Sequence, residues 1–169
     1  MKYIYSKILF LFIITSCLSQ NIDSKEDIKF VHLTDIHVTE GNENDFLLQK
    51  IIKEINESTN EFVVITGDLT NRGDDDELNR VYTLLSSLKI PYHIISGNHE
   101  TTWSESAGLT FKKLWGADRF VFSKGDYLFV GFPCGPYMKM GDGFVKKEDL
   151  LLLDKTIKDS LKGNLKKVL

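Results

Sequence analysis

Three short apolar runs, which recur roughly every 30 residues, constrain the fold more than any other feature of the sequence. They are IKFVHLT (28–34), FVVIT (62–66) and YHIIS (92–96), and all three contain β-branched residues. Between them, segments 46–55 and 75–88 carry apolar residues at helical spacing. This alternation of strands and helices predicts parallel strands joined by right-handed crossovers.

The second half of the chain is expected to contribute elements of a different kind. A short helix is predicted over 106–115, a hairpin over 119–132 and a longer helix over 146–161. The final residues, LKKVL (165–169), are typical of the start of another strand.

Composition and charge restrict the classes of function. With 169 residues, 42% of them hydrophobic and 27% charged, the chain is expected to form one globular domain with a core. The formal net charge of −3 argues against a broad nucleic-acid-binding surface, which needs clustered Lys and Arg. A phosphate substrate stays compatible with this charge, because bound metal ions would invert the local field.

The first twenty residues are interpreted as a targeting segment. Lys2 and Lys7 accompany the apolar run 8–14, which is too short to span a membrane and is typical of a secretory signal peptide. The following ITSC (14–17) resembles a bacterial lipobox, and by that resemblance Cys17 would be lipidated and become the new N-terminus. An ordinary signal peptide with an incidental cysteine is the alternative.

These features divide the chain into a signal peptide (1–16), a lipidated cysteine with a polar tether (17–27) and a folded domain (28–169). The lipid would anchor an exported protein to a membrane, in the periplasm or at the cell surface, without spanning it. Lipidation of Cys17 would leave Cys134 without a partner for an intrachain disulfide. Cys134 is expected to be a small buried residue and not a nucleophile.

Polar residues follow each of the three predicted parallel strands. They are Asp35 and His37 after the first strand, Asp68 after the second, and Asn98, His99 and Glu100 after the third. Parallel strands end at one edge of a sheet, where open α/β sheets bind ligands. Carboxylate, imidazole and amide groups suit divalent ions such as Mn, Fe or Zn, and two such ions can polarise a phosphoryl oxygen and hold a hydroxide. Three unrelated polar strand ends are the alternative.

The motifs DIH (35–37), GDLTN (67–71) and GNHE (97–100) together resemble the first three motifs of the calcineurin-like metallophosphoesterases. The resemblance covers roughly residues 28–169. It implies an α/β fold, a metallophosphoesterase-type β-sandwich flanked by helices (α/β/β/α) and incomplete at the C-terminus. It also implies a phosphate mono- or diester substrate and a dinuclear centre of divalent ions at the strand edge.

The resemblance assigns the metal ligands residue by residue. Asp35 and His37 would bind the first metal, Asp68 would bridge the two ions, and Asn98 would bind the second. Purple acid phosphatases have a Tyr three residues after the bridging Asp, where this chain has Asn71. A tyrosinate-bound iron enzyme is therefore not expected, and the chain looks more like the cyclic-nucleotide-phosphodiesterase-like branch of the family.

The same resemblance assigns the catalytic residues. His99 would be the histidine near the phosphate that is not a metal ligand, stabilising the transition state or protonating the leaving oxygen. Glu100 would orient His99. Asn71 and Arg72 flank the site as candidate phosphate contacts.

The chain departs from the family in its later motifs, which supply further histidine ligands. Its four histidines are His32, His37, His93 and His99, and none follows His99. The second metal would then keep only Asp68 and Asn98, which are too few to hold it tightly. We therefore expect the N-terminal part of a longer phosphoesterase, with impaired activity. The alternative is a catalytically inactive surface lipoprotein that keeps the scaffold as a binding or remnant module.

Other notable residues are expected to have structural roles. His32 is predicted to lie in the core or behind the metal ligands, and His93 to be structural. Trp103 and Trp115 are expected to pack and not to contact substrate. Asp142 lacks the other acids of a calcium-binding loop. The oligomeric state cannot be predicted from these features.

Overall fold

Two three-stranded sheets form the centre of the fold in the computed structural model, which describes residues 27–136, 141–162 and 167–168. The first sheet is parallel, in the order β1-β2-β3. Its strands are β1 (Phe30–Leu33), β2 (Phe62–Thr66) and β3 (Tyr92–Ile95). The second sheet, in the order β4-β5-β6, consists of β4 (Phe120–Lys124), β5 (Tyr127–Gly131) and β6 (Lys167–Val168). The predicted βαβαβ unit, the hairpin and the final strand are all present.

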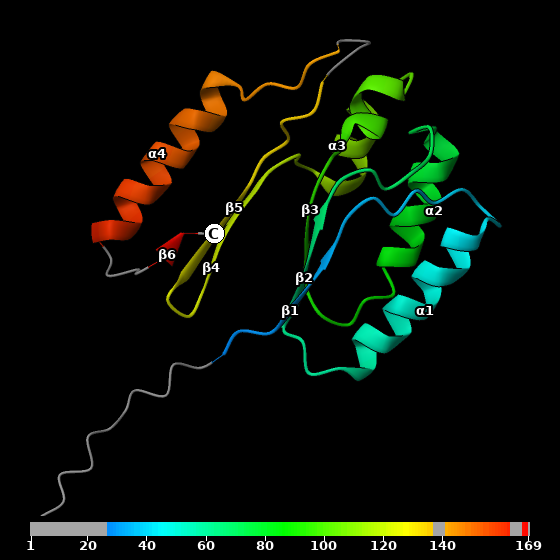
Figure 1. Ribbon diagram of the computed structural model, residues 1–169, viewed down its shortest axis with the longest axis horizontal. Helices are drawn as coiled ribbons and strands as arrows, with labels where there is room; N and C mark the ends of the chain where they lie inside the picture. Colours follow the sequence, from blue (N-terminus) through cyan, green and yellow to red (C-terminus); the bar gives the residue numbers. More distant parts are fainter. Residues whose placement is uncertain (1–26, 137–140, 163–166, 169) are drawn as a thin grey trace, which may run out of the picture.

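The helices cover the outer faces of the two sheets (Figure 1). On the side of the first sheet lie α1 (Glu43–Glu57), α2 (Asp75–Leu85) and α3 (Leu109–Trp115). On the side of the second sheet lies α4 (Lys147–Lys162). This arrangement confirms the predicted α/β/β/α layers. No helix within the described residues is long and apolar enough to cross a membrane.

The main core lies between the first sheet and helices α1 and α2. Alternate strand residues point to opposite faces, and on this face Val63 and Ile65 are fully buried. They cluster with apolar residues of both helices: Leu48, Ile52, Ile55, Leu78, Val81, Leu84 and Leu85. Burial of each large side chain contributes about 1.5–3 kcal/mol, so the helical spacing of these residues fixes both helices on the sheet.

An aromatic cluster joins the other face of the first sheet to the second sheet. The ring of Phe62 lies 5.1 Å from the rings of Phe30, Phe122 and Phe129. His93 stacks on Phe122 at 3.6 Å, and burial lowers the pKa of His93 below its usual value. His93 is therefore structural, as predicted, and favours the neutral form that an apolar contact requires.

Several helix boundaries differ from the sequence-based expectation, and α3 begins at Leu109, three residues later than predicted. Helix α1 begins three residues earlier than predicted, because the Asn42 side chain accepts a hydrogen bond from the Asp45 N–H at 2.8 Å and caps it. Helix α2 ends at Leu85, and the Ser87 and Leu88 N–H groups donate three residues back at 3.0 Å, closing tight turns instead.

A five-residue π-helix, His99–Trp103, follows β3 and was not predicted. Such short π segments are frequent at functional sites. The signal peptide, Cys17 and the tether up to residue 26 lie outside the described residues, so these assignments stay predictions.

Candidate metal centre

The loops after β1 and β2 are hydrogen-bonded to each other beyond the ends of the strands. The Asp35 N–H donates to the Gly67 carbonyl at 3.2 Å, and the His37 N–H donates to the Asp68 carbonyl at 3.0 Å. A parallel bridge between Val38 and Thr70 follows. The parallel ladder thus continues past the strands and lays two of the polar clusters side by side.

Side chains from all three strand ends converge at this edge. Candidate ligand atoms of His37, Asp68 and His99 lie within 4.8 Å of one another, and all three residues are half-buried. The rings of His37 and His99 meet edge to face, with centroids 4.6 Å apart. Two imidazoles and a carboxylate are a suitable donor set for a divalent transition metal or zinc.

Asp35, the other predicted ligand of the first metal, is exposed and lies outside this group of three among the described residues. Its carboxylate accepts a hydrogen bond from the Thr34 hydroxyl at 2.5 Å. Asp35 therefore stands at the correct edge of the sheet, with its oxygens engaged by a neighbour.

Asn98, the predicted ligand of the second metal, faces the predicted bridging carboxylate. With its nitrogen turned toward Asp68, the Asn98 amide donates to both carboxylate oxygens at 3.2 Å. Rotation of the amide by half a turn would present its oxygen to the same space. Asn98 and Asp68 could then share a cation, but they form a smaller donor set than the group of three.

The backbone of the site is held in an uncommon conformation. Asp35, His37 and Asp68 have positive φ values of 53°, 49° and 49°. Left-handed backbone costs a non-glycine residue about 1 kcal/mol, although Asp and His tolerate it better than most residues. The uncommon backbone thus coincides with three of the candidate ligands.

Close approach of two loops requires glycine at two positions. A Cβ on Gly97 would lie 2.1 Å from Oδ1 of Asp68 and 2.3 Å from its backbone nitrogen. A Cβ on Gly67 would lie 2.4 Å from the Gly97 nitrogen. The glycines of both motifs therefore allow the third loop to pack directly against Asp68, where the His99 N–H donates to Oδ1 at 3.1 Å.

Glu100 is fully buried and links the second and third loops. Its Oε1 accepts from the Leu69 and Thr70 N–H groups at 2.9 and 3.2 Å and from the Thr70 hydroxyl at 3.0 Å. Its Oε2 accepts from the Gly97 N–H at 2.9 Å. Burial raises the pKa of the Glu100 carboxyl against the effect of these hydrogen bonds. The Glu100 carboxylate thus ties the second loop to the third, and its predicted role in orienting His99 stays a prediction.

His99 is oriented by the backbone of the second motif. Its Nδ1 lies 2.6 Å from the carbonyl oxygen of Asn71, which makes Nδ1 the protonated nitrogen and leaves Nε2 for a ligand. The Asn71 side chain donates to the Thr39 hydroxyl at 2.9 Å. The exposed Arg72 pairs with Asp74 at 2.9 Å. Both predicted phosphate contacts thus have protein partners, and their contact with phosphate stays a prediction.

Some expectations about the positions of individual residues were wrong. His32 is exposed and not in the core, whereas its alternative place behind the metal ligands stays a prediction; its Nε2 lies 2.8 Å from the Thr66 hydroxyl. Cys134 is exposed and not buried. Trp103 is 64% exposed and stacks on His99, whereas Trp115 packs on Phe111 as expected. Periodicity could not reveal the exposure of Trp103 and Cys134, because Trp103 lies in the π-helix and Cys134 in an irregular segment.

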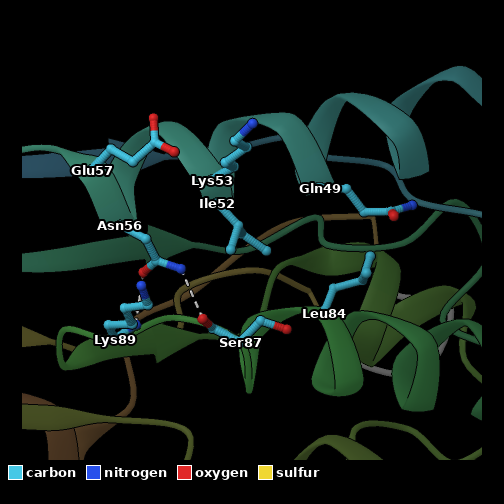
Figure 2. A pocket seen from close by; sticks show the side chains of 8 residues that line it. All are labelled: Gln49, Ile52, Lys53, Asn56, Glu57, Leu84, Ser87 and Lys89. Carbon is cyan, nitrogen blue, oxygen red and sulfur yellow. Dashed lines mark hydrogen bonds between the residues drawn. The ribbon is translucent and has the colours of Figure 1, made fainter.

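A separate surface hollow lies between the C-terminal ends of α1 and α2 (Figure 2). At its end, Asn56 donates to the Ser87 carbonyl at 2.9 Å and accepts from the Lys89 N–H at 2.7 Å. Helices that join parallel strands run back from the carboxyl edge, so this hollow lies at the edge opposite the candidate metal centre. Its hydrogen bonds tie the two helix ends together.

The structure is thus an α/β/β/α sandwich with a candidate His–Asp–His metal group at its parallel strand edge. The sequence matches the calcineurin-like phosphoesterase family over residues 28–159. The chain belongs to the calcineurin-like phosphoesterase family.

Curated relatives are described as probable cyclic nucleotide phosphodiesterases. The protein from Xenorhabdus bovienii is 28% identical over 111 residues, which are 59% of this chain and 43% of the relative. The protein from Vesicomyosocius okutanii is 27% identical over 130 residues, which are 77% of this chain and 53% of the relative. The chain thus spans about half the length of these relatives.

Solved structures show the same fold. A dimetal phosphatase from Danio rerio superposes with a TM-score of 0.64 at 14% identity, over 84% of this chain and 68% of that one. A purple acid phosphatase from yellow lupin superposes with a TM-score of 0.54 at 14% identity, over 78% of this chain and 27% of that one. The α/β/β/α architecture is therefore shared with metal-dependent phosphatases.

Proposed function

We propose that the protein is a metal-dependent phosphoesterase that hydrolyses phosphate diesters at the His37–Asp68–His99 edge, with nucleotide phosphodiesters as its substrates. The observation that carries the proposal is the convergence of these three side chains, whose candidate ligand atoms lie within 4.8 Å of one another. The backbone of two of them is left-handed and is held by hydrogen bonds between the loops. The family and the description of the curated relatives support the same reaction class.

The imidazole of His37 and the carboxylates of Asp68 and Asp35 fit divalent metal ions, which when bound would polarise the phosphoryl group and lower the pKa of the attacking water. His37 and Asp68 would hold the first ion, with Asp35 turning in from its contact with Thr34. Asp68 would also face the second ion together with Asn98. Manganese, iron and zinc are all compatible with these donors.

His99 would act on the leaving group and not as a permanent ligand. Its Nδ1 proton is directed to the Asn71 carbonyl, so Nε2 is the atom that holds and transfers a proton at the substrate. The π-helix and the Asp68–His99 hydrogen bond fix this ring beside the carboxylate.

The 169 residues offer the second ion only two predicted ligands, Asp68 and Asn98. We therefore propose that hydrolysis is slow when the concentration of metal ion is low. At high metal concentration the weak site fills by mass action, and turnover rises.

We also propose export and lipid anchoring at Cys17. Lys2, Lys7 and the apolar run 8–14 before the ITSC motif support this localisation. The intact mass of the protein from a membrane fraction tests it, because an acylated chain is heavier than the same chain starting at Cys17.

The test of function is turnover of bis(4-nitrophenyl) phosphate by the purified chain across a wide range of Mn²⁺ concentrations. We expect slow, chelator-sensitive hydrolysis that keeps rising after the first site is filled. Asp68→Asn should remove it, whereas Glu57→Gln, at an exposed acid at the C-terminal end of α1 and the opposite edge of the sheet, should not. Absence of turnover at every Mn²⁺ concentration, or turnover that survives Asp68→Asn, would refute the proposal.

A further inference from the structure

Trp103 occupies a position that neither the core nor the proposed chemistry explains. It is the last residue of the π-helix and, although large and apolar, it is 64% exposed. One face of its ring stacks on His99, with centroids 5.5 Å apart and an angle of 20° between the planes. The protein thus holds an aromatic surface open to solvent directly beside the proposed proton donor.

The support beneath Trp103 is rigid. The Thr101 hydroxyl donates to the carbonyls of Gly97 and Pro136 at 3.0 and 2.7 Å, and the Thr102 hydroxyl donates to Pro136 at 2.6 Å. These bonds fasten the π-helix to both the end of β3 and the segment after β5. Trp103 is therefore displayed from a fixed element, which is a low-entropy way to present a binding surface.

The position of the ring suits one kind of ligand. By the proposed function the phosphate is held beside His99, whose ring lies 5.5 Å from that of Trp103. A base on the open face of Trp103 would lie one stacking distance further from His99, a span that a ribose and its 5′ ester oxygen can bridge. Aromatic side chains stack on bases of any sequence, because every base has a π-face.

We infer that Trp103 is the base-binding residue of this site and that it selects nucleotide esters over phosphate esters without an aromatic group. This inference rests on the proposed function, because it needs a phosphate held at the His37–Asp68–His99 group. It assigns Trp103 to substrate binding, so Trp103 should affect affinity for the base without contributing to the phosphate site.

The test compares the affinities of adenosine 5′-monophosphate and ribose 5-phosphate, measured by calorimetry with Mn²⁺ present. Both carry the same phosphate and sugar, so the ratio of their affinities reports the base alone. We expect the wild-type chain to bind adenosine 5′-monophosphate roughly tenfold more tightly, given the usual strength of base–aromatic stacking. Trp103→Ala should abolish this preference and leave the affinity for ribose 5-phosphate unchanged.

Two further variants control the comparison. Trp103→Phe keeps an aromatic ring and should retain most of the preference. Leu109→Ala removes an equally exposed apolar side chain, 72% exposed, at the start of α3 and should retain all of it. Because Trp103 is exposed, its replacement should leave the thermal midpoint of unfolding nearly unchanged.

Three results would overturn the inference. They are a wild-type chain without preference for the base, a preference that survives Trp103→Ala, and an equal loss of both affinities, which would mean that Trp103 acts through His99. Failure of the proposed function looks different, because ribose 5-phosphate would then not bind even to the wild-type chain.

A spectroscopic measurement separates contact from indirect effects. The chain has two tryptophans, so Trp115→Phe leaves Trp103 as the only tryptophan emitter. Adenosine 5′-monophosphate should quench this emission, and ribose 5-phosphate should not. Emission that is unchanged by the nucleotide at concentrations that bind would contradict stacking on Trp103.

Discussion

At the scale of single residues, the site depends on strained and unusually close backbone. Asp35, His37 and Asp68 adopt left-handed conformations, and hydrogen bonds between the first two loops hold them there. Gly97 lets the third loop approach Asp68 to distances that no side chain would permit. The fixed placement of the candidate ligands therefore lowers the stability of the fold, as strained backbone at functional sites commonly does.

Gly97→Ala should remove metal binding while the fold survives. The new Cβ would lie 2.1 Å from Oδ1 of Asp68, so either the carboxylate or the third loop must move. We expect Mn²⁺ affinity to fall at least tenfold and the free energy of unfolding to drop by about 1–3 kcal/mol. Calorimetric titration and urea denaturation measure the two effects. Gly141→Ala is the matched control, because nothing lies within 4 Å of its Cβ, and an equal effect of both variants would contradict this account.

At the scale of elements, a buried ion pair joins α1 to α2. Asp45 is 1% exposed, and its carboxylate accepts from Nη2 and Nε of Arg80 at 2.9 and 3.1 Å. Burial raises the pKa of the Asp45 carboxyl, but the hydrogen bonds from Arg80 and two neighbours outweigh it and hold this pKa below its usual value. The loops of the candidate site lead into the N-terminal ends of α1 and α2, so the ion pair between these helices helps to fix the loops.

The Asp45 carboxylate should make stability depend on pH. Its pKa is lowered on folding, so its contribution is complete above the usual carboxyl pKa and is lost as pH falls through that value toward the folded one. We expect Asp45→Asn to lower the free energy of unfolding by about 2 kcal/mol at pH 7 and by clearly less at pH 3. Urea midpoints at both pH values test this, with the exposed Glu43→Gln as control. An equal loss at both pH values would show that the pair does not titrate as described.

Regular elements were predictable from the sequence, and local exceptions to regularity were not. The strand β2 was predicted to the residue, because five apolar and β-branched residues stand between turn signals. The π-helix His99–Trp103 was missed because five residues carry no readable period. The convergence of the strand ends followed from parallel topology alone. The hydrogen bonds of Glu100 could not be predicted, since its partners Leu69 and Thr70 lie some thirty positions earlier and meet it only in the fold.

At the scale of the whole molecule, the two sheets have different roles. The first sheet carries the candidate metal ligands at its edge, and the second packs on it through an aromatic cluster centred on Phe62, which is 3% exposed. Aromatic pairs at these separations contribute beyond their buried area. Sheet packing therefore determines whether the strand edge stays rigid enough to hold a metal.

Phe62→Ala should weaken the whole domain by about 3–5 kcal/mol, because it leaves a cavity between the sheets. A fall in both the thermal midpoint and the urea midpoint, with a single transition, is the expected result. Phe46→Ala on α1, where the side chain is 62% exposed, should change stability by less than about 0.5 kcal/mol. If the two variants behaved alike, the sheets would not depend on this cluster.

The central claim is that the His37–Asp68–His99 edge binds metal. Calorimetric titration of the purified chain with Mn²⁺ tests it most directly, beside Asp68→Asn and the exposed control Glu57→Gln at the far end of α1. We expect one ion to bind the wild-type chain and the Glu57→Gln variant with equal affinity, a second ion to bind much more weakly, and Asp68→Asn to bind neither well. A wild-type chain that takes up no Mn²⁺, or an Asp68→Asn variant that binds it as the wild type does, would contradict the account.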